Sequence, residues 1–404
     1  MLMLVKMALR NLKRYSRRTF ITCASIALGL AILLWLQCIL AGRNENMIQK
    51  ITSTSTGHLQ ILRQDYLENR TPNRSFNFDF ELPYAHSPRI YLPSLASTAE
   101  DSVPILLQGI IPLNESKVTD LKTYIVQGEY LSEKEDSPCA LREVLVGEEL
   151  TKHMNLELGD KIVILTQAND GTFGNELLRI TGIFNSGSPG FDKNNLFTHL
   201  SCAANIGVVN GVHEVSINVG EAKILNNVYL KLKDTLPQGL VMTTWKEVIP
   251  GISTLLNFND AFLKVLTFIL FTVIVLGVIN TLLINIFERT KEFGVMLALG
   301  TSTTQLMLLI LFECLFIGVF SIVVGIALGA LAVSYHLYAG FDLSLFLGET
   351  SGAAGFKFDL IIYPIFELLP FLKLSSVVIV FIVLAGLYPA LRASRVSPSE
   401  VMRS

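Results

Sequence analysis

Four long apolar stretches constrain this chain more than any other feature of its sequence. They cover residues 19–42, 263–287, 305–335 and 374–391, and leucine, isoleucine, valine and phenylalanine dominate each of them. A helix needs about 20 such residues to cross roughly 30 Å of hydrocarbon. The whole chain is 51% hydrophobic and 16% charged, which is too apolar for an ordinary soluble protein. We therefore predict an α-helical membrane protein with four transmembrane helices.

Basic residues flank these spans unevenly. Lysine and arginine precede the first span, lie between the second and third, and follow the fourth, whereas the loop 336–373 carries more acidic than basic residues. Cytoplasmic loops are enriched in lysine and arginine. We therefore expect cytoplasmic segments at 1–18, 288–304 and 392–404, with both termini in the cytoplasm. Residues 43–262 and the short loop 336–373 are expected on the other side of the membrane.

The first 18 residues have an amphipathic pattern. The apolar residues on one helical face are Leu2, Val5, Leu9 and Leu12, and the basic residues off that face are Lys6, Arg10, Lys13 and Arg17. Two interpretations stay open. The segment is either a helix lying in the membrane surface or a simple cytoplasmic extension of the first span.

Residues 43–262 are long enough for one large or two small folding units. Short stretches rich in β-branched or alternating apolar residues predict strands at 58–63, 103–111, 144–146, 161–166, 177–184, 214–219 and 227–232. Helices are predicted at 148–155 and 198–207, and a loop or insertion at 65–94, where no period is visible. We expect a large α+β extracytoplasmic domain with a mostly antiparallel sheet.

The pattern turns helical at Trp245 and continues, without a proline after Pro250, into the second span. This predicts a continuous helical stalk. The alternative is a helix that ends at the membrane surface near residues 257–260.

Three of the five cysteines, Cys23, Cys38 and Cys314, lie in predicted spans, where we expect small buried apolar residues. Cys139 and Cys202 fall in the extracytoplasmic domain, where an oxidising compartment permits a disulfide. The sequence does not give their separation in space, so this bond stays an open question.

The sequence lacks the motifs of several common catalytic sites. It contains no phosphate-binding loop of the type Gly-x-x-x-x-Gly-Lys-Ser/Thr, no Gly-x-Ser-x-Gly and no His-Glu-x-x-His, and its six histidines are scattered. Its net charge of −2 provides no field that attracts nucleic acid. We therefore expect a chain that is not an enzyme, binds no cofactor or metal itself and has no nucleic-acid partner.

The most informative segment is 288–304, which begins E-R-T-K-E-F-G-V-M-L-A-L-G. A loop that only reversed the chain would need neither this length nor this apolar content. We predict a helix that packs into a groove on a partner protein. The residues assigned to this contact are Glu288, Arg289, Lys291, Glu292, Phe293, Gly294, Met296, Leu299 and Gly300.

This segment resembles the coupling region of FtsX/MacB-type ABC transporter permeases, with Asn280 before it and Gly318 and Gly325 after it. The family pattern has alanine where this chain has Thr301. The stretches Ala8-Leu9-Arg10-Asn11-Leu12 and Tyr388-Pro389-Ala390-Leu391-Arg392 resemble the two ends of the family. The resemblance implies a permease in the bacterial inner membrane whose large domain is periplasmic.

Short motifs in the extracytoplasmic domain resemble the lipoprotein-releasing, LolC/LolE-like branch. They are Thr56-Gly57-His58-Leu59-Gln60-Ile61, Gly128-Glu129-Tyr130-Leu131 and Gly182-Ile183-Phe184. Ile111 departs from the aspartate common in that branch. Such a permease extracts lipoproteins from the membrane by mechanotransmission.

The resemblance also implies partners. These are a pair of LolD-like ATPase subunits that bind ATP and Mg²⁺, a second permease copy or paralogue, the lipid membrane and a periplasmic lipoprotein carrier. Two alternatives stay open. One is a MacB-like efflux permease for peptides, toxins or drugs, although such permeases usually carry a fused ATPase. The other is FtsX-like signalling to a cell-wall hydrolase.

A substrate with acyl chains needs a sheltered apolar route. The candidate substrate-facing residues in the first and second spans are Leu30, Leu33, Leu34, Leu36, Phe268, Phe271 and Val275. The simpler interpretation is that these side chains face lipid or each other.

Polar groups inside the predicted spans are candidates for contacts that hold the spans together. Asn280 and Glu313 are such groups, and a carboxylate at this depth is normally paired or neutralised. We expect Glu313 either to bond hydroxyls such as those of Thr303, Thr304 or Ser321, or to be protonated and bonded to backbone. Gly318, Gly325 and Gly329 predict a close helix contact on one face.

Overall fold

The computed structural model describes residues 2–133, 139, 141–220, 224–342, 344, 352–353, 356–357, 361–366 and 368–394. The chain divides into two compact units. The membrane unit comprises Met1–Asn44, Asn257–Leu343 and Ile361–Ser404, and the outer domain comprises Glu45–Leu256 and Ser344–Leu360. The end of the predicted cytoplasmic tail, from residue 395 onward, lies outside the described residues.

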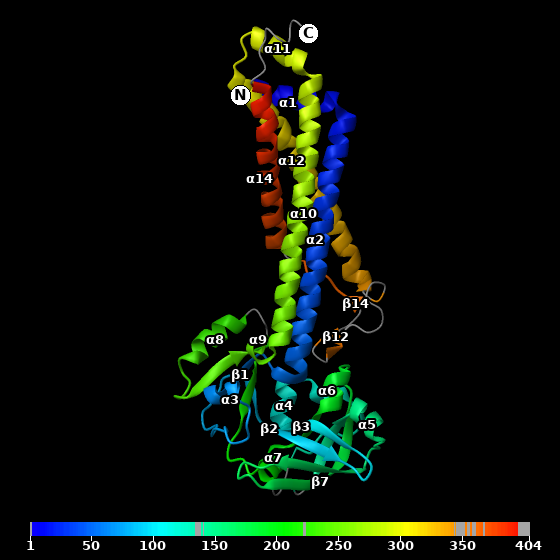
Figure 1. Ribbon diagram of the computed structural model, residues 1–404, viewed down its shortest axis with the longest axis vertical. Helices are drawn as coiled ribbons and strands as arrows, with labels where there is room; N and C mark the ends of the chain where they lie inside the picture. Colours follow the sequence, from blue (N-terminus) through cyan, green and yellow to red (C-terminus); the bar gives the residue numbers. More distant parts are fainter. Residues whose placement is uncertain are drawn as a thin grey trace. The chain divides into compact units, whose positions relative to one another are not determined.

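Helices build the membrane unit (Figure 1). They are α1 (Leu2–Arg14), α2 (Ser16–Ile51), α10 (Pro250–Glu288), α11 (Thr290–Ala298), α12 (Thr303–Ala339) and α14 (Leu368–Ser394), and the short strands β11 (Phe341–Asp342) and β14 (Ile361–Ile362) pair with each other. Within the described residues, α2, α10, α12 and α14 are long and apolar enough to cross a membrane. The predicted fold class, four spans with a large α+β domain, is confirmed.

Glycines set the helix contacts of α12 on two sides. A side chain at Gly325 would meet the Ala27 carbonyl oxygen of α2 at 2.9 Å, and one at Gly329 would meet Leu34. Gly318 instead faces Ile382 of α14 at 3.3 Å. The predicted close packing exists, but the expectation that all three glycines share one contact face is wrong, because α12 lies between two partners.

The outer domain is built on one ten-stranded sheet, in the order β10-β1-β9-β2-β3-β8-β5-β7-β4 with β6 pairing β2 and β7. Among the described strands only the β3–β8 and β5–β7 ladders are parallel, so the predicted mostly antiparallel α+β fold is confirmed. The strands are β1 (Leu59–Arg63), β2 (Ala85–Ser97), β3 (Ser102–Ile110), β4 (Ile125–Gly128), β5 (Glu143–Gly147), β6 (Lys161–Gln167), β7 (Phe173–Phe184), β8 (Asn195–His199), β9 (Glu214–Asn218) and β10 (Leu240–Thr244), with a separate pair β12 (Gly352–Ala353) and β13 (Phe356–Lys357).

Short helices accompany this sheet. They are α3 (Gln64–Glu68), α4 (Pro112–Val118), α5 (Glu148–Met154), α6 (Pro189–Asn194), α7 (Leu200–Gly207), α8 (Leu225–Lys233) and α9 (Trp245–Val248), with a π-helical turn at Thr52–Thr56 and a 3₁₀ turn at Leu121–Tyr124.

Three expectations about the chain path have clear outcomes. The strand predicted at 227–232 is wrong, because this segment forms α8 with Val228 and Leu232 buried one turn apart. The segment 65–94 is not one loop, since it contains most of α3 and the first ten residues of β2. The continuous stalk is confirmed, because α10 runs from Pro250 to Glu288 without interruption.

Covalent and ionic bonds stabilise the outer domain. Cys139 and Cys202 form a disulfide across a sequence separation of 63 residues, which answers the question left open by the sequence. The buried Arg89 guanidinium binds Glu115 in a bidentate pair, with Nη2 2.6 Å and Nε 3.0 Å from its carboxylate oxygens. Such forked pairs combine charge with defined geometry, so they orient β2 against α4.

Candidate coupling site

The short helix α11 has one buried and one exposed face. Phe293 is 1% exposed and Gly294 is also buried, whereas Val295 is 52% and Leu299 81% exposed. Glu288, Lys291 and Gly300 are exposed, Arg289 is buried, and Glu292 and Met296 are partly buried. The predicted contact residues therefore divide into an anchoring set and a surface set.

Phe293 belongs to the anchoring set. Its ring lies in the hydrophobic core of the membrane unit, and the Arg289 guanidinium carbon lies 4.9 Å from the ring centroid. The expectation that Phe293 offers an apolar contact to a partner is wrong for this structure, because no surface of the ring remains for a partner. The helical period directs Val295 and Leu299, which are four residues apart, to the opposite side.

A row of hydrogen-bonded charged and amide side chains holds α11 against α1 and α12. Glu313 of α12 accepts hydrogen bonds at one oxygen, Oε1, from Asn11 Nδ2 at 2.8 Å and from Arg289 Nη1 at 3.0 Å. Arg289 Nε also donates to Glu292 at 3.1 Å, and Arg14 donates to the other Glu292 oxygen at 2.9 Å. The order is therefore Asn11, Glu313, Arg289, Glu292 and Arg14.

Burial makes the bond between Arg289 and Glu313 stronger than the bond between Arg14 and Glu292. Arg289 and Glu313 are each 5% exposed, whereas the Arg14 side chain is 66% exposed. Burial by itself lowers the pKa of Arg289, but the Glu313 and Glu292 carboxylates outweigh it, so the pKa of Arg289 is raised. Removing one partner of a buried pair typically costs about 3–5 kcal/mol, while an exposed pair contributes about 0.2–1 kcal/mol.

The sequence interpretation found Glu313 but assigned it the wrong partners. Its bonds go to Asn11 and Arg289, and neither Ser321 nor the threonines at the start of α12 binds it: the Ser321 hydroxyl donates to the Ile317 carbonyl at 2.7 Å. Asn11 was missed as a site residue. A signal was present, because Asn11 lies on the same helical face as the buried Ala8 and interrupts an otherwise apolar stripe.

The residues predicted to face substrate occupy different environments. Leu30, Leu33, Leu34 and Phe271 are buried in the core of the membrane unit, Leu36 and Val275 are partly buried, and Phe268 is 69% exposed. Only Phe268 is thus openly accessible in the described chain, because the three leucines pack within the helix bundle. Asn280, on α10, is exposed.

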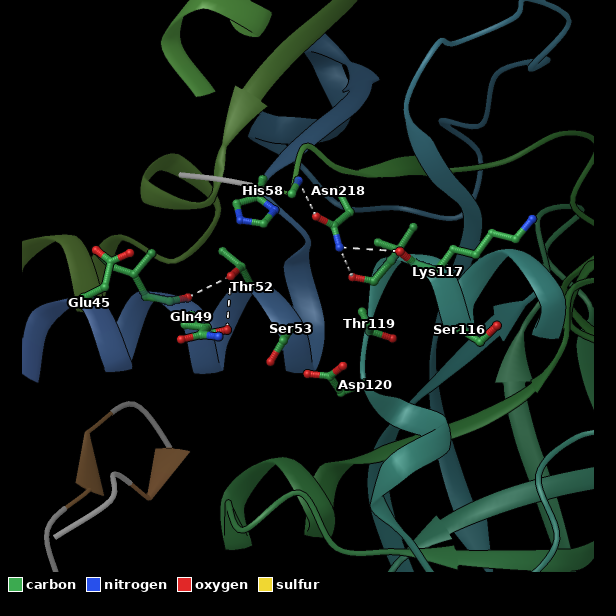
Figure 2. Close-up of a pocket in the computed structure, with 13 residues that line it drawn as sticks. Glu45, Gln49, Thr52, Ser53, His58, Ser116, Lys117, Thr119, Asp120 and Asn218 are labelled. Carbon is green, nitrogen blue, oxygen red and sulfur yellow. Dashed lines mark hydrogen bonds between the residues drawn. The ribbon is translucent and has the colours of Figure 1, made fainter. Parts of the chain in front are cut away.

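The outer domain contains a polar cavity of about 560 Å³ between the end of α2 and the turn after α4 (Figure 2). Asn218 donates to the Lys117 and Val118 carbonyls at 3.4 and 3.3 Å, and His58 lies beside it. Burial lowers the pKa of His58, opposed by a hydrogen bond with Asn218. Polar side chains dominate the lining, so this cavity does not suit an acyl chain.

Among the residues with described positions, no group of three or more histidine, cysteine, aspartate or glutamate side chains is arranged to hold a metal ion.

Two sequence families match this chain. Residues 19–242 match the MacB-like periplasmic core domain, which is more than half of the chain, and residues 264–398 match the FtsX-like permease C-terminal family. The second match contains α11, Arg289 and Glu313.

Individual relatives agree with these matches. The lipoprotein-releasing system transmembrane protein LolC of Xylella fastidiosa (strain Temecula1) is 21% identical over 423 aligned residues, covering 99% of this chain and 98% of LolC. The macrolide export ATP-binding/permease protein MacB of Shewanella sp. (strain ANA-3) is 23% identical over 401 aligned residues, covering 91% of this chain and 58% of MacB.

Proposed function

Because this chain belongs to the MacB/FtsX-like family of ABC transporter permeases, we propose that it is the permease subunit of a transporter that extracts lipoproteins from the inner membrane. ATP hydrolysis is performed by a separate pair of ATPase subunits, with Mg²⁺, and α11 is the coupling helix that they grip. The chain pairs with a second copy or a paralogue. Both termini lie in the cytoplasm, and the outer domain faces the periplasm and a soluble lipoprotein carrier.

The observation that carries this proposal is the two-sided structure of α11. The exposed Val295 and Leu299 offer apolar contacts to a partner groove, while Phe293 and Arg289 fasten the same helix to the rest of the membrane unit. A helix gripped on one side and anchored on the other transmits displacement. Glu313 receives that displacement directly, since it belongs to the long helix α12.

Lipoprotein as the substrate is supported by the relative LolC, which aligns over 99% of this chain and 98% of its own length. Energetics explain why such a substrate needs a protein route. Exposing one acyl chain of about 15 methylenes to water costs about 12 kcal/mol, at about 0.8 kcal/mol per methylene. A transporter must therefore replace bilayer contacts with its own apolar surface throughout the transfer.

Binding of the ATPase is tested by Leu299→Asp in the full-length chain. Burying a leucine contributes about 1.5–3 kcal/mol, so we expect affinity for the purified ATPase to fall about 10-fold to 150-fold. Leu158→Asp is the matched control, because Leu158 is an exposed leucine of the outer domain. Unchanged affinity of the Leu299→Asp chain would refute α11 as the coupling helix.

The substrate is tested separately by depleting the chain in its own cell and fractionating the two membranes. We expect lipoproteins to accumulate in the inner membrane, and restored expression of the Leu299→Asp chain not to release them. Normal lipoprotein distribution with greater sensitivity to drugs or peptides would favour the MacB-like alternative. Normal distribution with a defect in cell separation would favour FtsX-like signalling.

A further inference from the structure

An apolar groove lies in the membrane unit, between the corner formed by α1 and α2 and one side of α12. Its volume is about 560 Å³, which falls within the range of about 300–1,000 Å³ usual for ligand sites. Its lining includes Leu9, Leu12, Phe20 and Cys23 from α1 and α2, and Phe320 and Val323 from α12.

The groove is open and almost free of polar groups. Phe20 is 70%, Phe320 59% and Val323 62% exposed, whereas Cys23 at 5% forms part of the floor. The hydroxyl of Thr19, one of the few polar groups in the lining, donates to the Tyr15 carbonyl at 3.2 Å. Within the described residues, no segment covers this apolar surface, so an apolar occupant gains dispersion contact along its length.

Basic side chains border this groove. Lys13 lies four residues after Leu9, which lines the groove, and both belong to α1, so they share one side of that helix. Arg17 is likewise three residues before Phe20. Lys13 and Arg17 are exposed, and neither pairs with a carboxylate in the part of the chain that the structure describes.

We propose that this groove is a binding site for an anionic membrane phospholipid, with one acyl chain between α2 and α12 and the phosphate beside Lys13 and Arg17. The occupant is chosen by charge complementarity together with membrane location. The apolar walls suit any acyl chain, but the two cations favour a headgroup with net negative charge. The site is independent of what the transporter carries.

The lipid bound here also bears on the coupling site. Leu12 of the groove adjoins Asn11, which donates to Glu313 at 2.8 Å. Occupancy is therefore expected to stabilise the position of α1.

The test uses tryptophan quenching by brominated lipids in the full-length chain, with Trp35→Phe and Trp245→Phe removing the native signal. Phe20→Trp places the reporter in the groove, and Val273→Trp, at a 61% exposed position of α10, reports bulk lipid. Each cation that contacts the headgroup is expected to increase the preference for the anionic lipid about 5-fold. We expect brominated phosphatidylglycerol to outcompete brominated phosphatidylcholine about 5-fold to 30-fold at position 20 and equally at position 273.

Charge variants decide the interpretation. Lys13→Gln with Arg17→Gln should bring the preference at position 20 close to unity, whereas Lys264→Gln, an exposed cation of α10, should leave it unchanged. Equal quenching by both lipids at position 20, or a preference that survives the double substitution, overturns the proposal. Absence of quenching by either lipid at position 20 also overturns it, because another protein chain then covers the groove.

Discussion

The buried pair between Arg289 and Glu313 allows the most demanding test of the coupling site. We consider Arg289→Met, Glu313→Leu and the double variant. Each single change leaves one buried polar partner behind, which costs about 3–5 kcal/mol of unfolding free energy. The remaining bond from Arg289 to Glu292, at 3.1 Å, places the Glu313→Leu loss at the lower end of that range.

The double variant should be far more stable than the sum of the two single losses. Replacing both charges with apolar groups of similar volume is often nearly neutral. The Asn11 amide still loses its acceptor, which costs about 1–3 kcal/mol. The Glu313→Leu loss of about 3 kcal/mol and the Arg289→Met loss of about 3–5 kcal/mol add to about 6–8 kcal/mol, so we expect a coupling energy of at least about 3 kcal/mol.

The assay is equilibrium unfolding of the purified full-length chain in micelles, followed by Trp35 fluorescence in a Trp245→Phe background. Trp35 belongs to the membrane unit, so its signal reports that unit. The exposed pair of Arg14 and Glu292 serves as a control cycle, with an expected coupling of about 0.2–1 kcal/mol. Single losses of Arg289→Met and Glu313→Leu that add within about 0.5 kcal/mol would show that the two side chains do not interact.

Three further predictions concern stability. Buried His213 accepts a hydrogen bond from the Tyr91 N–H at 3.0 Å and donates to the Pro72 carbonyl at 2.9 Å, and burial lowers its pKa. Folding therefore favours the neutral form of His213, so the unfolding free energy should fall as the pH drops below about 6.5 towards the pKa of the folded state. Melting curves recorded over a pH series should show a smaller pH dependence for His213→Gln. Loss of the disulfide through Cys139→Ala should cost about 4 kcal/mol by loop closure, and a reducing agent should lower the melting temperature of the parent chain but not of the variant. Gly325→Ala should destabilise the membrane unit by about 1–3 kcal/mol, because the new methyl group meets backbone, whereas Gly277→Ala, with nothing within 4 Å, should be neutral or stabilising in the same unfolding assay.

The membrane class could be predicted because it depends on local composition. Whether a stretch of about 20 residues crosses a bilayer follows from the summed hydrophobicity of those residues alone. The helical nature of α11 followed similarly from its short-range pattern. The segment that became α8 shows the limit of such patterns, because its alternation fitted a strand while burial of Val228 and Leu232 on one side selected a helix.

The candidate site was only half predictable. Resemblance identified the segment that contains Arg289 and Phe293, but it could not say which face of the helix turns inward. That choice depends on the core into which Phe293 packs, and this core draws on α1, α10, α12 and α14 as well. The same limit applies to the candidate substrate residues, where Leu30 and Phe268 looked equivalent by hydrophobicity and differ in exposure.

Sequence by itself thus determined four helices long and apolar enough to cross a membrane, a large α+β domain and the short helix α11. Tertiary structure alone decided that Glu313 pairs with Asn11 and Arg289, and that Cys139 meets Cys202. The physical reason is separation along the chain. Asn11 and Glu313 are 302 positions apart, and only the packing of α1 on α12 brings the amide within 2.8 Å of the carboxylate.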